Sequence, residues 1–409
     1  MRRGQWGQWG RWGRVAAALV LTAAAGAADR PPGPARCAGS VPYTAGSGGY
    51  AVYRIPAVVR TPAGTLLAFA EGRVLHGAGD SGAVDLVLRR SADGGCTWGP
   101  LSVVAAGHGD TRGNPAPVVD PASGDVVLLS SGNAGTATES AVLQGLVDAA
   151  DGRRVYVQRS TDDGRSFSPP RDVTASVKRP DWRWYATGPG HALALGQGRH
   201  AGRLVVPADH SAAPPPGSPD TGREPRHYGA HALLSDDGGR TWRIGATDAT
   251  YDGWINSNET TAAELPDGSL FLSTRDQLGA APGHRSAARS HDGGASLDRP
   301  FAPQPALATV PVVQGSLLYV SVLGRPGLLL FSAPSRPDRR AAATLWTSTD
   351  GGRTATPALT LSPRPAAYSD LVRVDEETIG VLYETGRRGP YESIAFRRVP
   401  LDRLSPRER

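Results

Sequence analysis

The chain has 409 residues, 39% hydrophobic and 20% charged, a composition that fits one large globular domain or two ordinary ones and excludes wholesale disorder. Its formal net charge is +6, but the first 28 residues hold four arginines and no acid. The remainder is therefore close to neutral, at about +2, and carries no basic stripe of the kind that binds nucleic acid.

The N-terminus has the order of a secretory signal peptide over residues 1–28. Arginines 2 to 14 form a basic head, an apolar run of Ala, Val and Leu follows over 15–25, and small residues end the segment. The apolar run is too short to span a bilayer, so we expect a secreted, extracellular protein without a membrane span. Residues 29–48 are rich in Pro and Gly and predict a linker. A single domain over 49–402 and a short tail over 403–409 complete the expected organisation.

The chain has two cysteines, Cys37 and Cys96. They could pair in an oxidising exterior, but two cysteines do not make a disulfide framework, and the sequence leaves their pairing open. Neither cysteine has neighbours with zinc-ligand spacing, and the nine histidines show no such spacing either. We therefore expect no metal and no cofactor.

An eight-residue pattern, S-x-D-x-G-x-[TS]-[WF], begins at Ser91, Ser160 and Ser235, and weaker copies without the aromatic residue begin at Ser290 and Ser348. Asp and Gly build a tight turn, because the carboxylate accepts backbone N–H groups and Gly adopts a positive φ. The aromatic residue packs against the hairpin that the turn closes. The aspartates of the copies are expected to hold turns and to do no chemistry: Asp93, Asp162, Asp237, Asp292 and Asp350.

Short β-rich runs lie between the copies, for example over 83–88, 125–129, 203–206, 269–272 and 378–383. A repeat of about 60 residues that holds about four strands is typical of propeller blades with long loops, and about 350 residues would make about six of them. The sequence therefore predicts an all-β fold, a six-bladed β-propeller of four-stranded antiparallel blades. Only residues 139–149 suggest an amphipathic helix.

Charged residues stand at the ends of several predicted strands. Arg54 lies in an apolar strand entry, Glu259 precedes a strand that Arg275 closes, and Tyr368 leads into a strand pair that ends at Glu384. A buried arginine is unfavourable unless it meets an anion. Each of these residues could bind an anionic ligand, and a structural ion pair is the alternative for each.

These residues carry a resemblance to a known family, the sialidases, over about residues 50–397. Tyr53-Arg54-Ile55-Pro56 resembles the family's F/Y-R-I-P motif, and the repeated turns look like its Asp boxes. Other segments are similar to the family's motifs and follow in the family's order: Glu71-Gly72-Arg73 with Asp80, Asn258–Glu264 with Arg275, Gln314-Gly315-Ser316, and residues 367–371 with 382–384.

The resemblance implies a retaining exo-α-sialidase, a glycosidase that releases terminal α-linked sialic acid from glycoproteins, glycolipids or oligosaccharides. Tyr368 would be the nucleophile, Glu259 its base and Asp80 the general acid/base. The remaining implied roles concern the substrate: Arg54, Arg275 and Arg340 would grip its carboxylate, Glu384 would orient Arg54, and Arg73 would line the pocket.

Chemistry gives each implied role a reason. Planar guanidinium groups match a carboxylate in bidentate fashion. The same carboxylate would repel an anionic nucleophile, whereas a neutral phenol with a pKa near 10 only needs a base such as Glu259. Asp80 must protonate the leaving oxygen, so we expect partial desolvation to raise its pKa.

Several alternatives stay open. Arg339 competes with Arg340, and Asp85 competes with Asp80, although Asp80 in a Gly-rich loop is preferred to Asp85 in a strand. The Pro-rich segment 210–228 is expected to be a rim loop that shapes the leaving-group site; the alternative is that it is a solvated insertion. A trans-sialidase, a glycosidase of another nonulosonic acid and a non-catalytic glycan-binding propeller are the rival functions. We expect a monomer, and the sequence leaves the linkage preference open.

Overall fold

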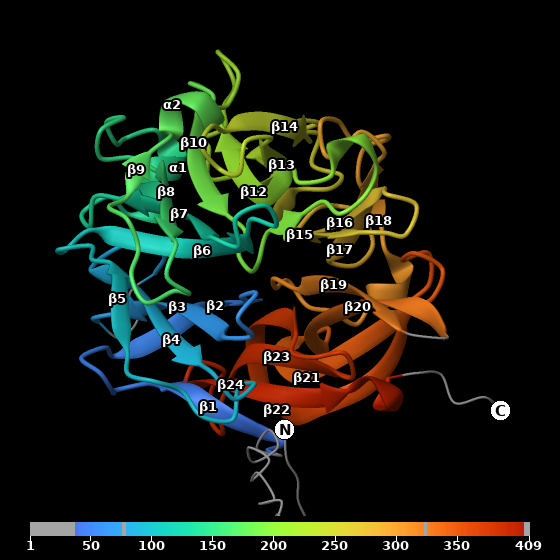
Figure 1. Ribbon diagram of the computed structural model, residues 1–409. Coiled ribbons are helices and arrows are strands. Elements are labelled where there is room, and N and C mark those ends of the chain that lie inside the picture. Colours follow the sequence, from blue (N-terminus) through green and yellow to red (C-terminus); the bar gives the residue numbers. More distant parts are fainter. Residues whose placement is uncertain (1–36, 76–78, 323–324, 405–409) are drawn as a thin grey trace, which may run out of the picture. The chain divides into compact units, whose positions relative to one another are not determined.

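The computed structural model describes residues 37–75, 79–322 and 325–404, which form β-strands joined by loops (Figure 1). The expected signal peptide and the first part of the expected linker lie outside these residues. The all-β fold is confirmed; the described part has two short α-helices, α1 (Glu139–Gln144) and α2 (Thr174–Val177), so the helix expected over 139–149 is shorter than predicted. None of the described helices is long and apolar enough to cross a membrane.

The strands form four hydrogen-bonded sheets, almost entirely antiparallel. The first sheet has eight strands and includes one parallel contact, between β4 and β6. Its strands are β2 (Val52–Arg60), β3 (Leu66–Arg73), β4 (Val84–Ser91), β5 (Ser102–Ala105), β6 (Thr111–Val119), β7 (Val126–Asn133), β8 (Arg154–Ser160) and β9 (Arg171–Asp172). The second sheet has five strands, β10 (Trp182–Thr187), β11 (Leu193–Ala194), β12 (Leu204–Ala212), β13 (Tyr228–Ser235) and β14 (Arg243–Thr247).

The third sheet has four strands, β15 (Ser257–Glu264), β16 (Leu270–Asp276), β17 (Arg285–Ser290) and β18 (Ala302–Pro303). The fourth has seven, β19 (Ser316–Val322), β20 (Arg325–Arg336), β21 (Arg339–Ser348), β22 (Thr356–Arg373), β23 (Thr378–Thr385), β24 (Ser393–Pro400) and β1 (Gly39–Thr44). In Figure 1 the sheets follow one another in chain order.

The first strand pairs with the last one. β1 runs antiparallel to β24, so residues 39–44 belong to a sheet and the linker expected over 29–48 is wrong for this segment. The reason is visible at Tyr43, which is buried and donates a hydrogen bond from its hydroxyl to the carbonyl of Ala68. A short strand with one deeply buried aromatic side chain gives little sequence signal.

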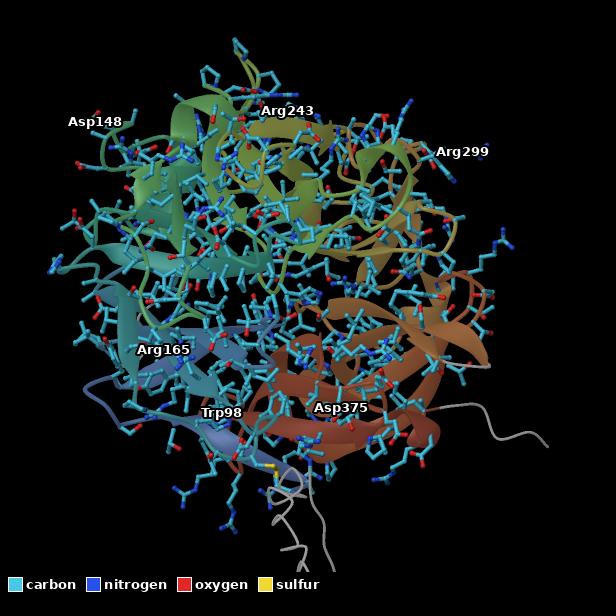
Figure 2. The ribbon with its side chains drawn as sticks, in the orientation of Figure 1. Trp98, Asp148, Arg165, Arg243, Arg299 and Asp375 are labelled. Atoms are coloured by element: carbon cyan, nitrogen blue, oxygen red, sulfur yellow. A yellow bond between two sulfur atoms is a disulfide. The ribbon has the colours of Figure 1, made fainter. Side chains whose placement is uncertain are left out.

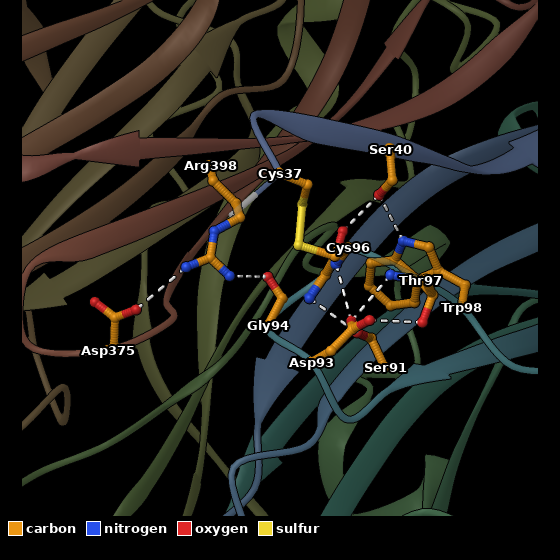
Figure 3. Close-up of a disulfide and its surroundings, with 11 residues drawn as sticks. Cys37, Ser40, Ser91, Asp93, Gly94, Cys96, Thr97, Trp98, Asp375 and Arg398 are labelled. Atoms are coloured by element: carbon orange, nitrogen blue, oxygen red, sulfur yellow. Dashed lines mark hydrogen bonds and ion pairs between the residues drawn. A yellow bond between two sulfur atoms is a disulfide. The ribbon is translucent and has the colours of Figure 1, made fainter. Parts of the chain in front are cut away.

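A disulfide between Cys37 and Cys96 settles the pairing that the sequence left open (Figure 3). It joins the segment before β1 to the first repeated turn. Ser40 strengthens the same junction, because its hydroxyl donates to the carbonyl of Gly95 at 2.6 Å and accepts from the indole N–H of Trp98 at 2.8 Å. The N-terminal strand is thus fixed covalently and by side-chain hydrogen bonds.

The repeated turns share one hydrogen-bond pattern. In the third copy the Ser235 hydroxyl donates to Asp237, and the backbone N–H and the hydroxyl of Thr241 donate to the same carboxylate. The two copies without an aromatic residue keep these bonds at Asp292 and Asp350. The aromatic side chain is therefore not needed to form the turn, and the aspartates act in the structural role expected of them.

The inner strands meet around one buried carboxylate, that of Asp370 in β22. It accepts hydrogen bonds from the backbone N–H of Val58 (2.8 Å), from the backbone N–H of His191 (2.9 Å) and from the hydroxyl of Ser316 (2.8 Å). The His191 ring nitrogen Nδ1 lies 2.7 Å from the same carboxylate. Asp370 thereby links the first sheet, the fourth sheet and the loop between β10 and β11. It lies two positions after Tyr368 on β22, so these bonds limit how far that part of β22 can move.

Apolar side chains fill the space between the sheets, and charged ones lie outside. Some clusters of buried residues combine strands that are near one another in the chain, as in the group of Val127, Leu204 and Trp242. Another joins the two ends of the described chain, as in the group of Tyr43, Val87 and Phe396. Figure 2 shows Asp148 and Arg299 at the edges of the molecule, and both are exposed. Several of the charged residues that lie inside instead gather at one cavity or directly behind it, among them Asp209, Arg73 and Glu384.

Candidate active site

A cavity of about 260 Å³ lies between the ends of several inner strands. Arg54 reaches it from β2, Glu259 from β15, Arg275 from the end of β16 and Tyr368 from β22. Asp80 and Arg340 line it as well. Six of the eight predicted site residues, spread from Arg54 to Tyr368, thus surround one space; the other two lie directly behind it.

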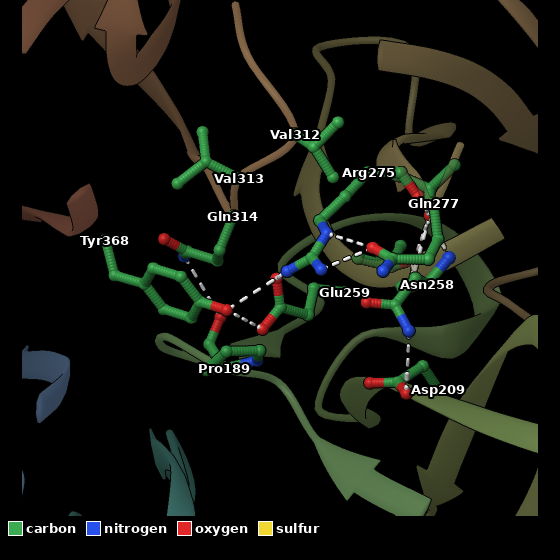
Figure 4. Close-up of polar contacts among 12 residues, drawn as sticks. Pro189, Asp209, Asn258, Glu259, Arg275, Gln277, Val312, Val313, Gln314 and Tyr368 are labelled. Atoms are coloured by element: carbon green, nitrogen blue, oxygen red, sulfur yellow. Dashed lines mark hydrogen bonds and ion pairs between the residues drawn. The ribbon is translucent and has the colours of Figure 1, made fainter. Parts of the chain in front are cut away.

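Tyr368 and Glu259 form the centre of the site (Figure 4). The phenol hydroxyl donates a hydrogen bond to Oε1 of Glu259, while the Arg275 guanidinium contacts Oε2 of Glu259 at 2.6 Å and the phenol oxygen at 3.1 Å. Burial and the charge of Glu259 raise the pKa of Tyr368 well above its ordinary value, although Arg275, Arg340 and Arg54 oppose the shift. The phenol is therefore neutral at rest and already touches a group that can accept its proton.

Glu384 holds two of these residues from behind. It is fully buried, and its Oε1 accepts from Nε of Arg54 at 2.7 Å and from the backbone N–H of Ile55 at 2.9 Å. Its Oε2 accepts from the backbone N–H of Tyr368 at 3.1 Å. Ile55 has a positive φ of 57°, which is strained for a β-branched residue. One carboxylate thus fixes both the first arginine and the backbone of the candidate nucleophile.

Arg340 has a different kind of partner. Its guanidinium donates to the carbonyl of Val312 and to the hydroxyl of Tyr391, both at 3.0 Å. Arg54 pairs with Glu384 and Arg275 with Glu259, whereas no described carboxylate forms an ion pair with Arg340. Among these five residues three guanidinium groups thus face two carboxylates, and Arg340, which has no carboxylate partner among the described residues, can bind an anion. The neighbouring Arg339 is exposed and pairs with Asp338, so Arg340 is the one that faces the cavity.

Tyr391 was not predicted from the sequence. Besides its bond to Arg340, its ring lies 4.0 Å from the guanidinium carbon of Arg54, a cation–π distance. It therefore contacts two of the three arginines. It follows a Gly-Pro turn in a loop and belongs to no pattern, so the sequence offered no signal for it.

Asp80 lies at the mouth, with a side chain 47% exposed, and accepts a hydrogen bond from Arg73 at 2.7 Å. Arg73 is buried, also contacts Glu71 at 2.6 Å, and is not among the residues that line the cavity, so its expected direct place in the pocket is corrected to one behind Asp80. Asp85 lies outside the cavity, where it accepts from Tyr50 and from the backbone of Gly107.

The expectation of a raised pKa for Asp80 is also wrong for this unliganded structure. Burial raises the pKa, but the charges of Arg73 and Arg54 and the hydrogen bond from Arg73 outweigh it and lower the pKa below its ordinary value. The sequence could not show this, because the balance depends on how closely the guanidinium groups approach.

Other residues of the cavity wall were also missed. Gln277 could have been found, because it lies two positions after Arg275, directly past the end of β16, and accepts a hydrogen bond from Nε of Arg275 at 2.8 Å. Asn258 belongs to the motif that carries Glu259, whereas further polar and aromatic residues of the wall come from segments without a motif: Asn114, Glu139, Trp184, Asp209 and Tyr228.

Of the expected rim loop over 210–228, only Tyr228 lines the cavity. Within this loop Asp220, Glu224 and His227 place potential metal-ligand atoms within 4.8 Å of one another. These side chains already have partners, since Asp220 contacts His227 and Arg226 while Glu224 accepts from Thr221 and Gly222. The group lies outside the cavity.

Comparisons with known proteins agree with the motif order. The model of the BNR repeat-like domain family matches residues 64–381. The chain is 31% identical to a sialidase of Bacteroides fragilis over 83% of its own length and 61% of that protein, so it spans about three-fifths of that relative. It is 30% identical to an exo-alpha-sialidase of Aspergillus fumigatus over 86% of its own length and 85% of that protein. Among solved structures, that of the Hadza microbial sialidase Hz136 has a TM-score of 0.77 and 26% identity, with 90% of this chain and 69% of the other covered.

Proposed function

The chain belongs to the sialidase family of glycoside hydrolases, and from this premise we propose that it is an exo-α-sialidase that acts with retention of configuration. The observation that carries the proposal is the contact between the neutral phenol of Tyr368 and the carboxylate of Glu259, beside three guanidinium groups. This arrangement suits a substrate whose reacting carbon bears a carboxylate, as the anomeric carbon of sialic acid does.

The charge and size of the cavity support the substrate class. The surplus positive charge of Arg54, Arg275 and Arg340 over Glu259 and Glu384 complements one carboxylate. The volume of about 260 Å³ lies just below the range of about 300–1,000 Å³ typical of small-molecule pockets. A cavity of this size favours a single terminal sugar over an internal stretch of a glycan. We propose sialylated glycoproteins, glycolipids or oligosaccharides as substrates.

The proposed reaction has two displacements. The Tyr368 oxygen attacks the anomeric carbon while Glu259 accepts the phenol proton, and Asp80 protonates the departing glycosidic oxygen. Asp80 then removes a proton from a water molecule that cleaves the sugar–tyrosine bond, and the proton on Glu259 returns to the phenol. Two inversions give net retention, in the manner of glycosidases that use a tyrosine nucleophile.

Substrate binding has a further effect on Asp80 in this mechanism. The positive charge of Arg54 is one of the causes that lower the pKa of Asp80 in the unliganded site. A substrate carboxylate bound to Arg54 offsets that charge and also excludes water. The bound sugar thus raises the pKa of Asp80 toward the value that a general acid requires.

We also propose that the strands form six blades of a propeller. The eight-stranded sheet divides into β2–β5 and β6–β9, and the second and third sheets supply one blade each. The seven-stranded sheet divides at β22, because residues 356–365 pair with β21 and residues 366–373 pair with β23. The outer strand of the last blade is β1, paired with β24. We propose a secreted, extracellular monomer from which residues 1–28 are removed.

The test is hydrolysis of a fluorogenic α-sialoside by the purified full chain, with Tyr368→Phe as the variant and Tyr383→Phe, a buried tyrosine outside the cavity, as its control. We expect wild type and the control to release both the fluorophore and sialic acid, with the α-anomer appearing first in NMR spectra, and the Tyr368 variant to be nearly inactive. A folded wild-type protein that does not cleave α-sialosides would contradict hydrolysis. Transfer of the sugar to added lactose in place of water would indicate a trans-sialidase.

A further inference from the structure

Arg285 on β17 is a fully buried arginine that the proposed mechanism does not use. Its side chain is 1% exposed, and it is not among the residues that line the cavity. In the sheet it stands directly opposite Arg275 of β16. Residues that face each other on antiparallel strands point to the same side of the sheet. Arg285 therefore lies next to one of the cavity's arginines without reaching the cavity itself.

The partners of Arg285 among the described residues are all neutral. Its guanidinium donates to the backbone carbonyl of Val313 at 3.3 Å and to the hydroxyl of Ser273 at 2.9 Å. The guanidinium carbon lies 5.1 Å from the centroid of the Phe331 ring. Its Nε is buried and has no hydrogen-bond partner in the part of the chain that the structure describes. The positive charge is thus solvated only by a carbonyl, a hydroxyl and an aromatic ring.

This placement is unfavourable in the unliganded protein for two reasons. A buried cation without a counter-ion has lost its hydration and has gained no ion pair in return. In addition, like charges that face each other on neighbouring strands repel, as Arg275 and Arg285 do here. Burial lowers the pKa of Arg285 to about 9, with Glu259 opposing the shift and Arg275 adding to it, so the guanidinium still carries its charge at neutral pH. Such a charge is complementary to an anion that the described residues do not supply.

The position of Arg285 indicates which anion that is. Arg285 and Arg340 donate to consecutive backbone carbonyls, those of Val313 and Val312, so one short segment joins the buried cation to another arginine of the cavity. With Arg275 opposite it, Arg285 adjoins two of the three guanidinium groups that would bind the substrate carboxylate. Water screens a charge less in a protein interior than at its surface, so the charge of Arg285 acts over this distance.

We propose that Arg285 supplies a fourth positive charge to the site and strengthens the binding of the substrate carboxylate without touching the substrate. The inference rests on the proposed sialidase function, because the anion is the carboxylate of that substrate. The competing explanation is that Arg285 only holds Val313 and Ser273 by hydrogen bonds. That role needs hydrogen-bond donors but no charge, and this difference makes the two explanations separable.

The experiment measures the dissociation constants of two ligands by titration calorimetry on the purified full chain. One ligand is the 2,3-unsaturated analogue of sialic acid, which carries the carboxylate, and the other is its uncharged methyl ester. In Arg285→Gln, which keeps donors but has no charge, we expect the acid to bind about tenfold more weakly, the order expected for one partly screened charge, and the ester to change by less than about twofold. Arg285→Lys keeps the charge and should retain most of the preference for the acid.

The matched control is Arg203→Gln. Arg203 is also buried, but it forms an ion pair with Asp236 outside the cavity, so this variant should keep the wild-type preference for the acid. If Arg285→Gln does not fold, Arg285→Met gives the same comparison, because an apolar chain of similar length replaces the buried cation. On a fluorogenic α-sialoside the uncharged variant should show a KM raised by a similar factor and a kcat within about threefold of wild type, since the carboxylate is present in both the bound substrate and the transition state.

Two results would overturn the inference. Equal weakening of the acid and the ester in Arg285→Gln would show a structural role, and so would an unchanged preference for the acid. An Arg285→Lys variant that loses the preference as fully as Arg285→Gln would show that the charge is not what matters. A folded wild type that binds neither ligand and cleaves no α-sialoside would contradict the proposed function itself, whereas an active wild type with an unchanged preference in Arg285→Gln contradicts only this inference.

Discussion

The hydroxyl of Tyr368 donates a hydrogen bond to Oε1 of Glu259, although 109 positions separate the two residues in the chain. Arg275 contacts both, so the phenol, the carboxylate and one guanidinium form a closed triangle. In this triangle Glu259 has two tasks, because it accepts the phenol proton and balances the charge of Arg275. The arrangement explains how a residue with a strongly raised pKa can still act as a nucleophile: its proton has a fixed destination.

Replacing the carboxylate that accepts the phenol proton should abolish most activity. Glu259→Gln keeps the shape of the side chain but cannot accept the proton, so we expect kcat on an α-sialoside to fall by about 10²–10⁴-fold. The matched control is Glu264→Gln at the other end of β15, where the carboxylate binds the backbone of Gly196 and Gln197. The control should retain wild-type kcat; retention of kcat by Glu259→Gln would show that another group takes the proton.

If Asp80 is the general acid, the loss of activity in Asp80→Asn should depend on how much the leaving group of the substrate needs a proton. For a sialyl disaccharide, whose leaving alkoxide needs a proton, kcat/KM should fall by about 10²–10⁴-fold. For an aryl sialoside, whose leaving phenolate is stable by itself, the loss should be much smaller. Asp85→Asn is the control, because Asp85 lies outside the cavity and binds Tyr50 and the backbone of Gly107. Equal losses on both substrates would contradict the role of Asp80.

Tyr391 should affect binding more than chemistry. In Tyr391→Phe the ring still covers Arg54, but Arg340 loses its bond to the hydroxyl. Among the described residues, the Arg340 guanidinium then keeps only its hydrogen bond to the carbonyl of Val312, so its position becomes less defined. We expect KM to rise by roughly 3- to 10-fold, the loss of about one hydrogen bond, with kcat nearly unchanged. Tyr156→Phe, which keeps its ring against Arg112 outside the cavity, should leave both constants unchanged; an unchanged KM in Tyr391→Phe would contradict the positioning role.

Acid should destabilise the fold through two buried histidines. The Nδ1 atoms of His210 and His231 lie 3.0 Å apart. Burial and the charge of Arg179 lower the pKa of His231 to about 3, and burial together with His231 lowers that of His210. The unfolded chain binds protons at these rings below about pH 6.5, whereas the folded chain does not, so stability falls as pH decreases from about 6.5 toward 3.

Urea denaturation at several pH values between 7.5 and 4.5 measures this effect. In His231→Phe the slope of the unfolding free energy against pH should be smaller by up to about 1.4 kcal/mol per pH unit. His191 acts with the opposite sign: its pKa is raised, because the charge and hydrogen bond of Asp370 outweigh burial, so its contribution is present at low pH and lost as pH rises through the raised value. An unchanged slope in His231→Phe would mean that the buried pair is protonated in the folded protein.

Much of the site was predictable because its chemistry leaves charged residues in apolar strands. The charged residues that stand out in this way are Arg54, Glu259 and Arg275, and Tyr368 is found through its motif. The repeated turns predict where hairpins close. Glu384 also follows from its place at the end of a strand, since a buried carboxylate needs a cation.

The rest depends on distances that the sequence does not contain. Tyr391 lies in a loop without a pattern. In the sequence Asp370 is only a polar residue two positions after the nucleophile. Its role depends on the fold, which places the backbone N–H groups of Val58 and His191 against its carboxylate. The lowered pKa of Asp80 results from opposing effects of burial and several guanidinium groups, whose balance only the folded geometry fixes. The strand at 39–44 was hidden because a single tyrosine supplies most of its burial.

The most direct measurement is to trap the covalent intermediate. Incubation with 2,3-difluorosialic acid, in which fluorine beside the anomeric carbon slows the second displacement, should add one sugar to the protein, and peptide mass spectrometry should place it on Tyr368. Glu259→Gln should be labelled far more slowly, and Tyr368→Phe should not be labelled. A wild-type enzyme that hydrolyses α-sialosides but carries the sugar on another residue, or forms no adduct and releases the inverted anomer, would contradict the account.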